Sequence, residues 1–436
     1  MNKERRIAAI VLLLCGVFLV LLSLLYRDID AWSVDFKAVY YAFRYLALGH
    51  DLYNPARLAA YFLSQNQADA TSAHAAVQTV SLFDYPPTAF AFFAPFALLP
   101  FKIAAFMWRS LMVLLLAAAS MLMWEFGSPW SPRVSLILAG LLLANCVGVF
   151  ALGNPAGIVI GLVVLCTSCF FSNRYVLLGE IGLAVVLSIK PHDAGMVWLF
   201  FLLAGGTLRK RALRTLGWAV ILWVPGILWT TAVASHWPLE LRANLHTVLV
   251  QGGENSPGPD SPANNTVGQI IGFQAVASVF RDQPGFYGTM TAVIVWPLIG
   301  LWIWVTLRSR FSIANGWLAL ASASALTMLP VYHRLYDAKL ILLAIPACAM
   351  LWARRGLLGW LALVITSGAF VLTADLPNVL FAALVKSWHI VAGGWLGKVE
   401  TILFYRSATL ALLAMGVFYL VVYARSSNRH EVVAET

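Results

Sequence analysis

A polar stretch between about residues 26 and 100 separates the first two long apolar segments and carries the side chains best suited to chemistry. Asp35 lies near its start, between Trp32 and Phe36. A carboxylate at a boundary between water and lipid is partly desolvated, which raises its pKa and makes it a better proton acceptor. Asp35 is therefore our candidate general base. The alternative is that Ser33 or Asp35 only caps the helix that follows.

The same stretch contains Asp28 and Asp30, whose D-x-D spacing holds a divalent metal in many transferases. Two acids alone are too few ligands for such an ion, because hard cations take six or more oxygen ligands. We therefore interpret Asp28 and Asp30 as solvated surface acids.

Two short polar clusters lie at the ends of later apolar segments. Lys190 and His192 belong to the first cluster, and His333, Arg334 and Asp337 belong to the second. Cations at adjoining helix ends could bind a phosphate or pyrophosphate group. The alternative is that these groups pair with one another, for example Arg334 with Asp337. A run of amides from Asn264 to Gln269 is suited to hydrogen bonds with sugar hydroxyls, although a polar loop needs no ligand.

The composition places these clusters in a membrane protein. The chain has 436 residues, of which 61% are hydrophobic and 11% charged, whereas soluble domains carry about 25% charged residues. The net charge of +10 comes from short basic clusters between apolar runs, a distribution that reflects membrane topology and not nucleic-acid binding. All five cysteines fall in apolar runs, so we interpret the C-x-x-C of Cys166 and Cys169 as packing.

The apolar runs predict a single all-α polytopic membrane domain over residues 1–436. A spanning helix needs about 20 apolar residues, and about twelve segments qualify: 7–26, 102–124, 134–152, 155–171, 175–190, 194–207, 215–233, 286–307, 312–330, 338–353, 356–373 and 403–424. The segments 175–190 and 194–207 are short and could form a hairpin that does not fully cross. Basic loops fall on the side of both termini, which the positive-inside rule assigns to the cytoplasm.

This topology places three long loops on the extracytoplasmic face: 27–101, 234–285 and 374–402. Within the first, residues 36–48 have apolar side chains at helical spacing, which predicts an amphipathic helix on the membrane surface. A second short helix follows near 57–63, and the polar, alanine-rich residues 65–79 are interpreted as a mobile insertion. Residues 88–99 predict a re-entrant or partial helix before Pro100.

Several motifs together resemble a known enzyme family. They are Asp35-Phe with Tyr40-Tyr41, Gly49-x-x-x-Tyr53, Tyr85-Pro-Pro, Lys190-Pro and the Asn-x-Thr-x-Gly-Gln loop that ends at Gln269. The chain resembles glycosyltransferase family 87, one of the GT-C membrane glycosyltransferases, over most of residues 30–345. The family often has Gly-Gln-x-Asn where this chain has Gly153-Asn-Pro, a departure that bears on the acceptor.

The resemblance implies transfer of a sugar, typically mannose, from a polyprenyl phosphate to an extracytoplasmic lipid or glycan acceptor in a bacterial inner membrane. Nucleotide sugars are confined to the cytoplasm, so an enzyme that works outside needs a lipid-carried donor. Our hypothesis is an inverting reaction with Asp35 as the base, in which His333, Arg334 and Lys190, supported by His192, bind the donor phosphate. No metal or other cofactor is then required. Weaker candidates for contact with sugar or acceptor are Asp84, Tyr85, Asn265, Gln269, Tyr332 and Asp337.

Two other functions stay open at this stage. A flippase or transporter for a polyprenyl-phosphate carrier would share the number of spans and the cationic phosphate site, but it needs no base at the boundary. A non-catalytic scaffold protein of envelope synthesis needs neither Asp35 nor His333. The chain has no Walker A, G-x-G-x-x-G, H-E-x-x-H or G-x-S-x-G motif, so nucleotide and hydrolase chemistry are unsupported.

Overall fold

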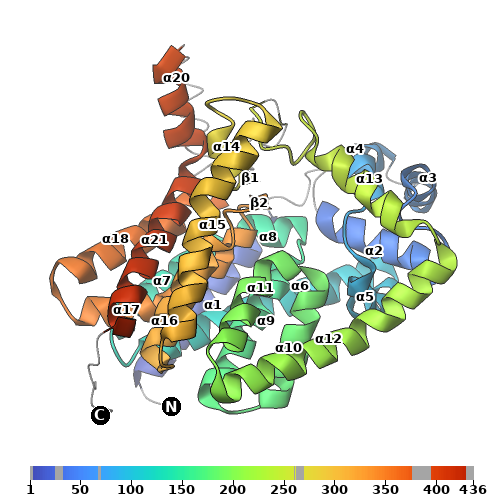
Figure 1. The fold of residues 1–436 in the computed structure, drawn as a ribbon. Helices are drawn as coiled ribbons and strands as arrows, with labels where there is room; N and C mark the ends of the chain where they lie inside the picture. The colour runs from blue at the N-terminus through green and yellow to red at the C-terminus, as the bar shows by residue number, and fades with distance from the viewer. Residues whose placement is uncertain are drawn as a thin grey trace.

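The computed structural model describes residues 3–24, 33–66, 70–259, 261, 270–375 and 394–428, and nearly all of them are helical (Figure 1). The first part contains α1 (Lys3–Leu24), α2 (Val34–Ala47), α3 (Pro55–Gln65), α4 (Ala70–Ser81), the 3-10 helix η2 (Pro87–Ala89), α5 (Phe90–Ala97) and α6 (Phe101–Gly127). The middle part contains α7 (Pro132–Ala144), α8 (Val147–Leu152), α9 (Ala156–Ser172), α10 (Val176–Ile189), α11 (Pro191–Leu203), α12 (Gly206–Val233) and α13 (Trp237–Leu249).

The last part adds further helices and a minimal two-stranded sheet. Its elements are β1 (Ile270–Ile271), α14 (Phe273–Ala277), α15 (Pro284–Arg308), α16 (Ile313–Leu326), β2 (His333–Arg334), the 3-10 helix η4 (Asp337–Ala344), α17 (Ile345–Ala353), α18 (Gly356–Leu372), α20 (Gly394–Glu400), the π-helical turn η5 (Thr401–Tyr405) and α21 (Ser407–Asn428). The strands pair antiparallel, with Ile271 opposite His333.

Each of the twelve predicted apolar segments overlaps at least one of these helices. Five described segments are long and apolar enough to cross a bilayer by themselves: Phe101–Gly127, Pro132–Leu152, Gly206–Val233, Pro284–Arg308 and Ser407–Ser427. The structure therefore establishes a helical protein with five candidate membrane-spanning helices among the described residues, and the count of twelve spans stays a prediction. Helices α10 and α11 are each about 20 Å long, which is shorter than a hydrocarbon core of about 30 Å.

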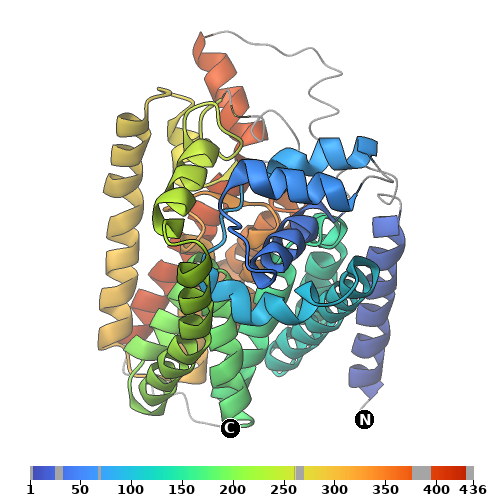
Figure 2. The ribbon, with the colours of Figure 1, turned by 90° about the vertical axis from the view of Figure 1, so that its right-hand side faces the viewer.

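The two ends of the helical bundle differ. The start of α1 and the end of α21 lie at one end, whereas α2, α3, α4, α13 and α20 gather at the opposite end (Figures 1 and 2). Helices α2, α3 and α4 lie toward this end of the bundle, and α5 lies below α2, next to α6 and α12 (Figures 1 and 2). The arrangement places the first loop at the end of the bundle away from the termini, as alternating spans predict.

The first loop is packed more tightly than the sequence suggested. Eight of the fourteen residues of α2 are buried within the protein, from Phe36 to Leu46, because α3, α4, α5 and α6 surround this helix. The helix lies at the predicted position and packs mainly against protein, and its location at the membrane surface stays a prediction. The stretch interpreted as a mobile insertion forms α4 from residue 70 onward, with Ala73, Ala76 and Val80 buried.

Two further differences concern the later loops. The second loop contains the helix α13, which the sequence analysis did not identify. The basic run from Arg209 to Arg214 belongs to the first turns of α12, where Arg211 donates to the carbonyl oxygen of Phe170 at 2.6 Å. Arg214 pairs with Glu180 at 2.7 Å. These arginines tie α12 to the ends of α9 and α10 instead of lying free in water.

Candidate active site at the end of the bundle

Asp35 lies in the first turn of α2, and backbone contacts to the helical bundle fix where that helix begins. The amide of Ser33 donates to the carbonyl oxygen of Ala151 at 2.8 Å, and a guanidinium nitrogen of Arg109 donates to the Ser33 hydroxyl. Ser33 occupies the N-cap position without a side-chain capping bond, so the hydroxyl anchors α2 to α6 instead of capping it. The Asp35 carboxylate is directed to the bundle, where it meets Asn154.

The turn from Gly153 to Pro155 presents Asn154 to Asp35. Gly153 has a positive φ of 65°, and a Cβ at this position would lie 2.9 Å from the Cβ of Phe36. Only glycine fits both constraints. The indole nitrogen of Trp108 donates to the Gly153 carbonyl oxygen at 2.8 Å, which holds the turn against α6.

Asn154 connects the acid to a buried lysine. Its Oδ1 accepts from the amide of Ala156 at 2.8 Å and from Nζ of Lys190 at 3.3 Å. Its amide nitrogen donates to Oδ2 of Asp35 at 2.7 Å. Because Oδ1 is committed to two donors, the orientation of the amide is fixed. Among the described residues, the other oxygen of Asp35 has no hydrogen-bond partner, and it is the atom available to a ligand.

Lys190 lies between α10 and α11 and is buried, with 5% of its surface exposed. Its Nζ donates to Oδ1 of Asp337 at 2.6 Å and lies 3.9 Å from Oδ2 of Asp193. The ammonium group also lies 5.1 Å from the ring centre of Tyr336, a cation–π contact. Burial would lower the pKa of Lys190, but the charges of Asp337 and Asp193 outweigh that effect and raise it. Lys190 is therefore charged and already paired.

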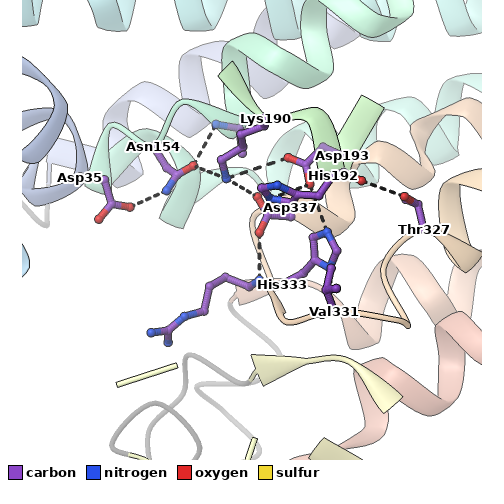
Figure 3. A network of polar contacts seen from close by, with 11 residues as sticks. Asp35, Asn154, Lys190, His192, Asp193, Thr327, Val331, His333 and Asp337 are labelled. Carbon is purple, nitrogen blue, oxygen red and sulfur yellow. Dashed lines mark hydrogen bonds and ion pairs between the residues drawn. The ribbon is translucent and has the colours of Figure 1, made fainter. Parts of the chain in front are cut away.

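The second cluster packs against the first, as Figure 3 shows. His333 is fully buried, and its Nε2 lies 3.3 Å from Oδ1 of Asp193. The exposed His192 places its own Nε2 3.6 Å from the same oxygen. The hydroxyl of Thr327 donates to the backbone carbonyl of His192 at 2.9 Å. One continuous set of polar contacts thus runs from Asp35 to His333.

Arg334 connects the second long loop to the cluster. Its backbone amide donates to Oδ2 of Asp337 at 2.9 Å, while its guanidinium donates to Oδ1 of Asn255 at 3.0 Å and lies 3.6 Å from Glu254. The proposed pairing of Arg334 with Asp337 therefore occurs through the backbone and not through the guanidinium. The Asp337 carboxylate is instead shared between this amide and Lys190.

Asp84 forms the far side of the site. It lies in the extended segment before η2, which Asn244 of α13 holds by donating to the carbonyl oxygens of Tyr53 and Phe83 at 3.1 Å each. The Tyr53 hydroxyl donates to the carbonyl oxygen of Tyr85 at 2.8 Å. These bonds position the segment, so Asp84 comes from a rigid element and not from a free loop.

Burial makes two carboxyl groups of this site unusually basic. The pKa of Asp35 is raised to about 6 by burial, against the opposing effects of the Asn154 hydrogen bond and of the charges on Lys190 and Arg334. The pKa of Asp84 is raised to about 6 by burial, partly offset by Lys190 and reinforced by the charge of Asp35. Burial likewise raises the pKa of Tyr332, with Asp84 adding to the effect. The charge of Asp35 acts on Asp84, and the charge of Asp84 acts on Tyr332. The three side chains therefore belong to the same site.

Most of the residues singled out by sequence thus gather at one place. Asp35, Lys190, His192, His333 and Asp337 join one network, and Asp84, Tyr85, Tyr332 and Arg334 border it. Asn265 and Gln269, as well as Asp28 and Asp30, lie outside the described residues. Sequence reasoning missed Asn154, Asp193, Asn255 and Tyr336, which lie at or beside motifs that were noticed.

A half-buried carboxylate with one held oxygen and one available oxygen can accept a proton from a hydroxyl. The fold and this site together indicate a helical membrane protein with a cluster of acidic and basic side chains at one end of its bundle. The family comparison is consistent with that class: the model of glycosyltransferase family 87 matches residues 83–332, which is more than half of the chain.

The chain belongs to glycosyltransferase family 87, and it is a membrane glycosyltransferase. The matched residues include Asp84, Asn154, Lys190 and Asp193, whereas Asp35 and His333 lie outside them. No curated protein and no solved structure matches the chain.

Proposed function

We propose that the protein moves a sugar, mannose by its resemblance to the family, from a polyprenyl phosphate to an acceptor hydroxyl on the extracytoplasmic face of a bacterial inner membrane. Membership of the family supports glycosyl transfer. The observation that carries the rest is the Asp35 carboxylate, which Asn154 holds by one oxygen at 2.7 Å while the other has no partner among the described residues.

The proposed reaction is a single displacement at the anomeric carbon. The acceptor oxygen forms a bond to that carbon while the bond from the carbon to the phosphate oxygen breaks, and the free oxygen of Asp35 takes the hydroxyl proton. The products are the glycoside with inverted configuration and polyprenyl phosphate. Asp35 then releases its proton to water. A positioned base of this kind contributes about 10²- to 10⁴-fold to the rate.

The charge on the leaving phosphate needs a nearby cation. Lys190 and Arg334 are the cations whose charge acts on the Asp35 carboxyl group, so a phosphate between them lies close to the base. Both cations already have partners, because Lys190 is bound to Asp337 and Arg334 lies beside Glu254. Donor binding would therefore rearrange these pairs instead of filling an unpaired cationic site.

A donor-cleavage assay tests this function. The full-length protein in liposomes is given polyprenyl-phosphate mannose labelled in the sugar, with a bacterial membrane lipid extract as the source of acceptor. We expect one polyprenyl phosphate released for each labelled sugar found in a new glycolipid or glycan. Movement of intact donor between the leaflets without cleavage would contradict the proposal and indicate a carrier. Cleavage of a glucose donor but not of the mannose donor would correct the sugar alone.

A further inference from the structure

The protonation of His333 is fixed by its backbone neighbour. Nδ1 of His333 lies 3.1 Å from the carbonyl oxygen of Val331, and because a carbonyl can only accept, Nδ1 carries the proton. In the neutral ring Nε2 then presents a lone pair, and it does so toward Oδ1 of Asp193. Both side chains are fully buried, and neither Nε2 of His333 nor the oxygens of Asp193 has a hydrogen-bond partner among the described residues.

The contacts around Asp193 are longer than charge-assisted hydrogen bonds usually are. Oδ1 lies 3.3 Å from Nε2 of His333 and 3.6 Å from Nε2 of His192, whereas charge-assisted bonds to a carboxylate are about 2.7–2.9 Å long. One ligand atom from each of the three residues lies within 4.8 Å of the others. Ligand atoms about 2.0–2.2 Å from a tetrahedral zinc ion lie about 3.4 Å from one another, which is close to the spacing of the two pairs that involve Oδ1 of Asp193.

The site around His192, Asp193 and His333 also has more acidic than basic side chains, which favours the binding of a cation. The described site contains five acids, and two cations accompany them. The acids are Asp35, Asp84, Asp193, Asp337 and Glu254, and the cations are Lys190 and Arg334. Lys190 is bound at 2.6 Å to Asp337 and forms only a longer ion pair of 3.9 Å with Asp193, so this cation is shared, and the side-chain nitrogens closest to Asp193 are those of the two imidazoles. A fully buried carboxylate whose ammonium partner is shared with a second acid is costly unless a further cation pairs with it.

We propose that His192, Asp193 and His333 bind a divalent transition-metal cation, with zinc the best match, through Nε2 of each imidazole and a carboxylate oxygen of Asp193. Two imidazoles and one carboxylate form a ligand set of zinc sites that keep one coordination position open. The carbonyl of Val331 acts on His333 as the outer partner that typically orients a metal-bound imidazole. This inference departs from our sequence-based expectation that no metal is needed. That expectation relied on Lys190 and Arg334 to bind the phosphate, but both already lie beside acids.

The proposed function suggests a role for the metal site. This role rests on the proposed function, whereas the existence of the site does not. A metal with an open position can take a phosphate oxygen of the donor and so offset the acid excess that would otherwise repel the phosphate. The metal site itself stands on the geometry of three residues. Its test is therefore made without donor or acceptor.

Zinc binding by the purified full-length protein in detergent is the direct test. The protein carries an affinity tag without histidine, is stripped with a chelator and is titrated with Zn²⁺ against a competing fluorescent chelator, while bound zinc is counted by mass spectrometry. His192→Ala is the first variant, because that side chain is 44% exposed and its loss disturbs packing least. Asp193→Asn is the second, and the exposed His246, changed to Ala, is the matched control.

We expect about one zinc per chain in the native protein and in His246→Ala, and binding at least 100-fold weaker in both cluster variants. Thermal unfolding in the absence of zinc confirms that each variant is folded. Equal zinc binding by native protein and folded His192→Ala would overturn the proposal, since the ion would then bind elsewhere. No binding by the native protein would also overturn it and leave a proton between His333 and Asp193. Neither result bears on the donor-cleavage assay, so the metal proposal can fail while the proposed function holds.

Discussion

Asp35 combines two properties that a general base needs, an available oxygen and a pKa close to the working pH. Burial raises its pKa to about 6, so the carboxyl group is ionised at neutral pH yet more basic than an ordinary aspartate. The sequence located this residue because it follows an apolar segment among aromatic neighbours. It did not locate Asn154, because an amide between glycine and proline resembles an ordinary turn.

The raised pKa predicts a pH profile at the residue scale. Asp35 is protonated below pH about 6, and the protonated acid cannot accept the acceptor's proton. The rate is therefore expected to fall about tenfold for each pH unit below 6 and to level off above it. Initial rates of sugar transfer across pH 4.5–8 measure this. Asp84 has a similar pKa, so the variant Asp84→Asn is the control. If it keeps the fall in rate below pH 6, that fall is assigned to Asp35. If the fall disappears in this variant, the assignment to Asp35 is contradicted.

Asn154 is a positioning residue, since it reaches the reacting atoms only through Asp35. Its hydrogen bond lowers the pKa of Asp35 against the dominant effect of burial. In Asn154→Ala we expect the rate to fall by up to about 10²-fold and the acid limb to move to higher pH. A purely structural role would lower the rate without moving that limb. The pH profile of the folded variant separates the two outcomes.

At the scale of elements, the site depends on how closely α2 approaches the turn between α8 and α9. Gly153 has a positive φ, and a Cβ there would collide with Phe36. Periodicity predicted α2 and α9 near their observed positions, because apolar spacing fixes a helix. It could not predict that α2 is buried on most sides, since α3 to α5 cover it only in three dimensions.

Replacing Gly153 tests this close approach. We expect Gly153→Ala to cost about 1–2 kcal/mol for the left-handed backbone alone, with a further loss from the contact with Phe36. Because Asn154 is the next residue, the rate of transfer is expected to fall as well. Gly217→Ala in α12 is the control, since nothing lies within 4 Å of the new Cβ and alanine favours a helix. Equal melting temperatures for the two variants would contradict the packing argument.

At the scale of the whole molecule, the two ends of the bundle separate the termini from the site (Figure 2). The sequence predicted this separation from the basic loops, which alternating spans place on the side of both termini. It could not predict how Lys190, Asp193 and Asp337 pair. Those contacts form only when α10, α11 and η4 pack together, and local sequence patterns do not predict such long-range contacts.

Labelling with a membrane-impermeant maleimide tests the predicted orientation. Ala56→Cys, exposed in α3, is expected to react from outside intact spheroplasts, whereas Arg310→Cys, exposed between α15 and α16, should react only after the membrane is opened. The five native cysteines are buried or half-buried and give the background signal. The reverse pattern would place the site in the cytoplasm, where a nucleotide sugar is available, and would remove the reason for a lipid-carried donor.

The most direct test of the central claim compares the native protein with Asp35→Asn in sugar transfer and in thermal stability. We predict a rate lower by about 10²- to 10⁴-fold, with Asp282→Asn, an acid outside the network, as the matched control. Because the folded-state pKa of about 6 lies above the usual 3.8, ionisation of this carboxyl group lowers the stability progressively as the pH rises from about 3.8 to about 6, and the loss is complete above pH 6. The neutral variant should therefore melt no lower than the native protein at pH 7. A folded Asp35→Asn that transfers sugar at the native rate would contradict the account.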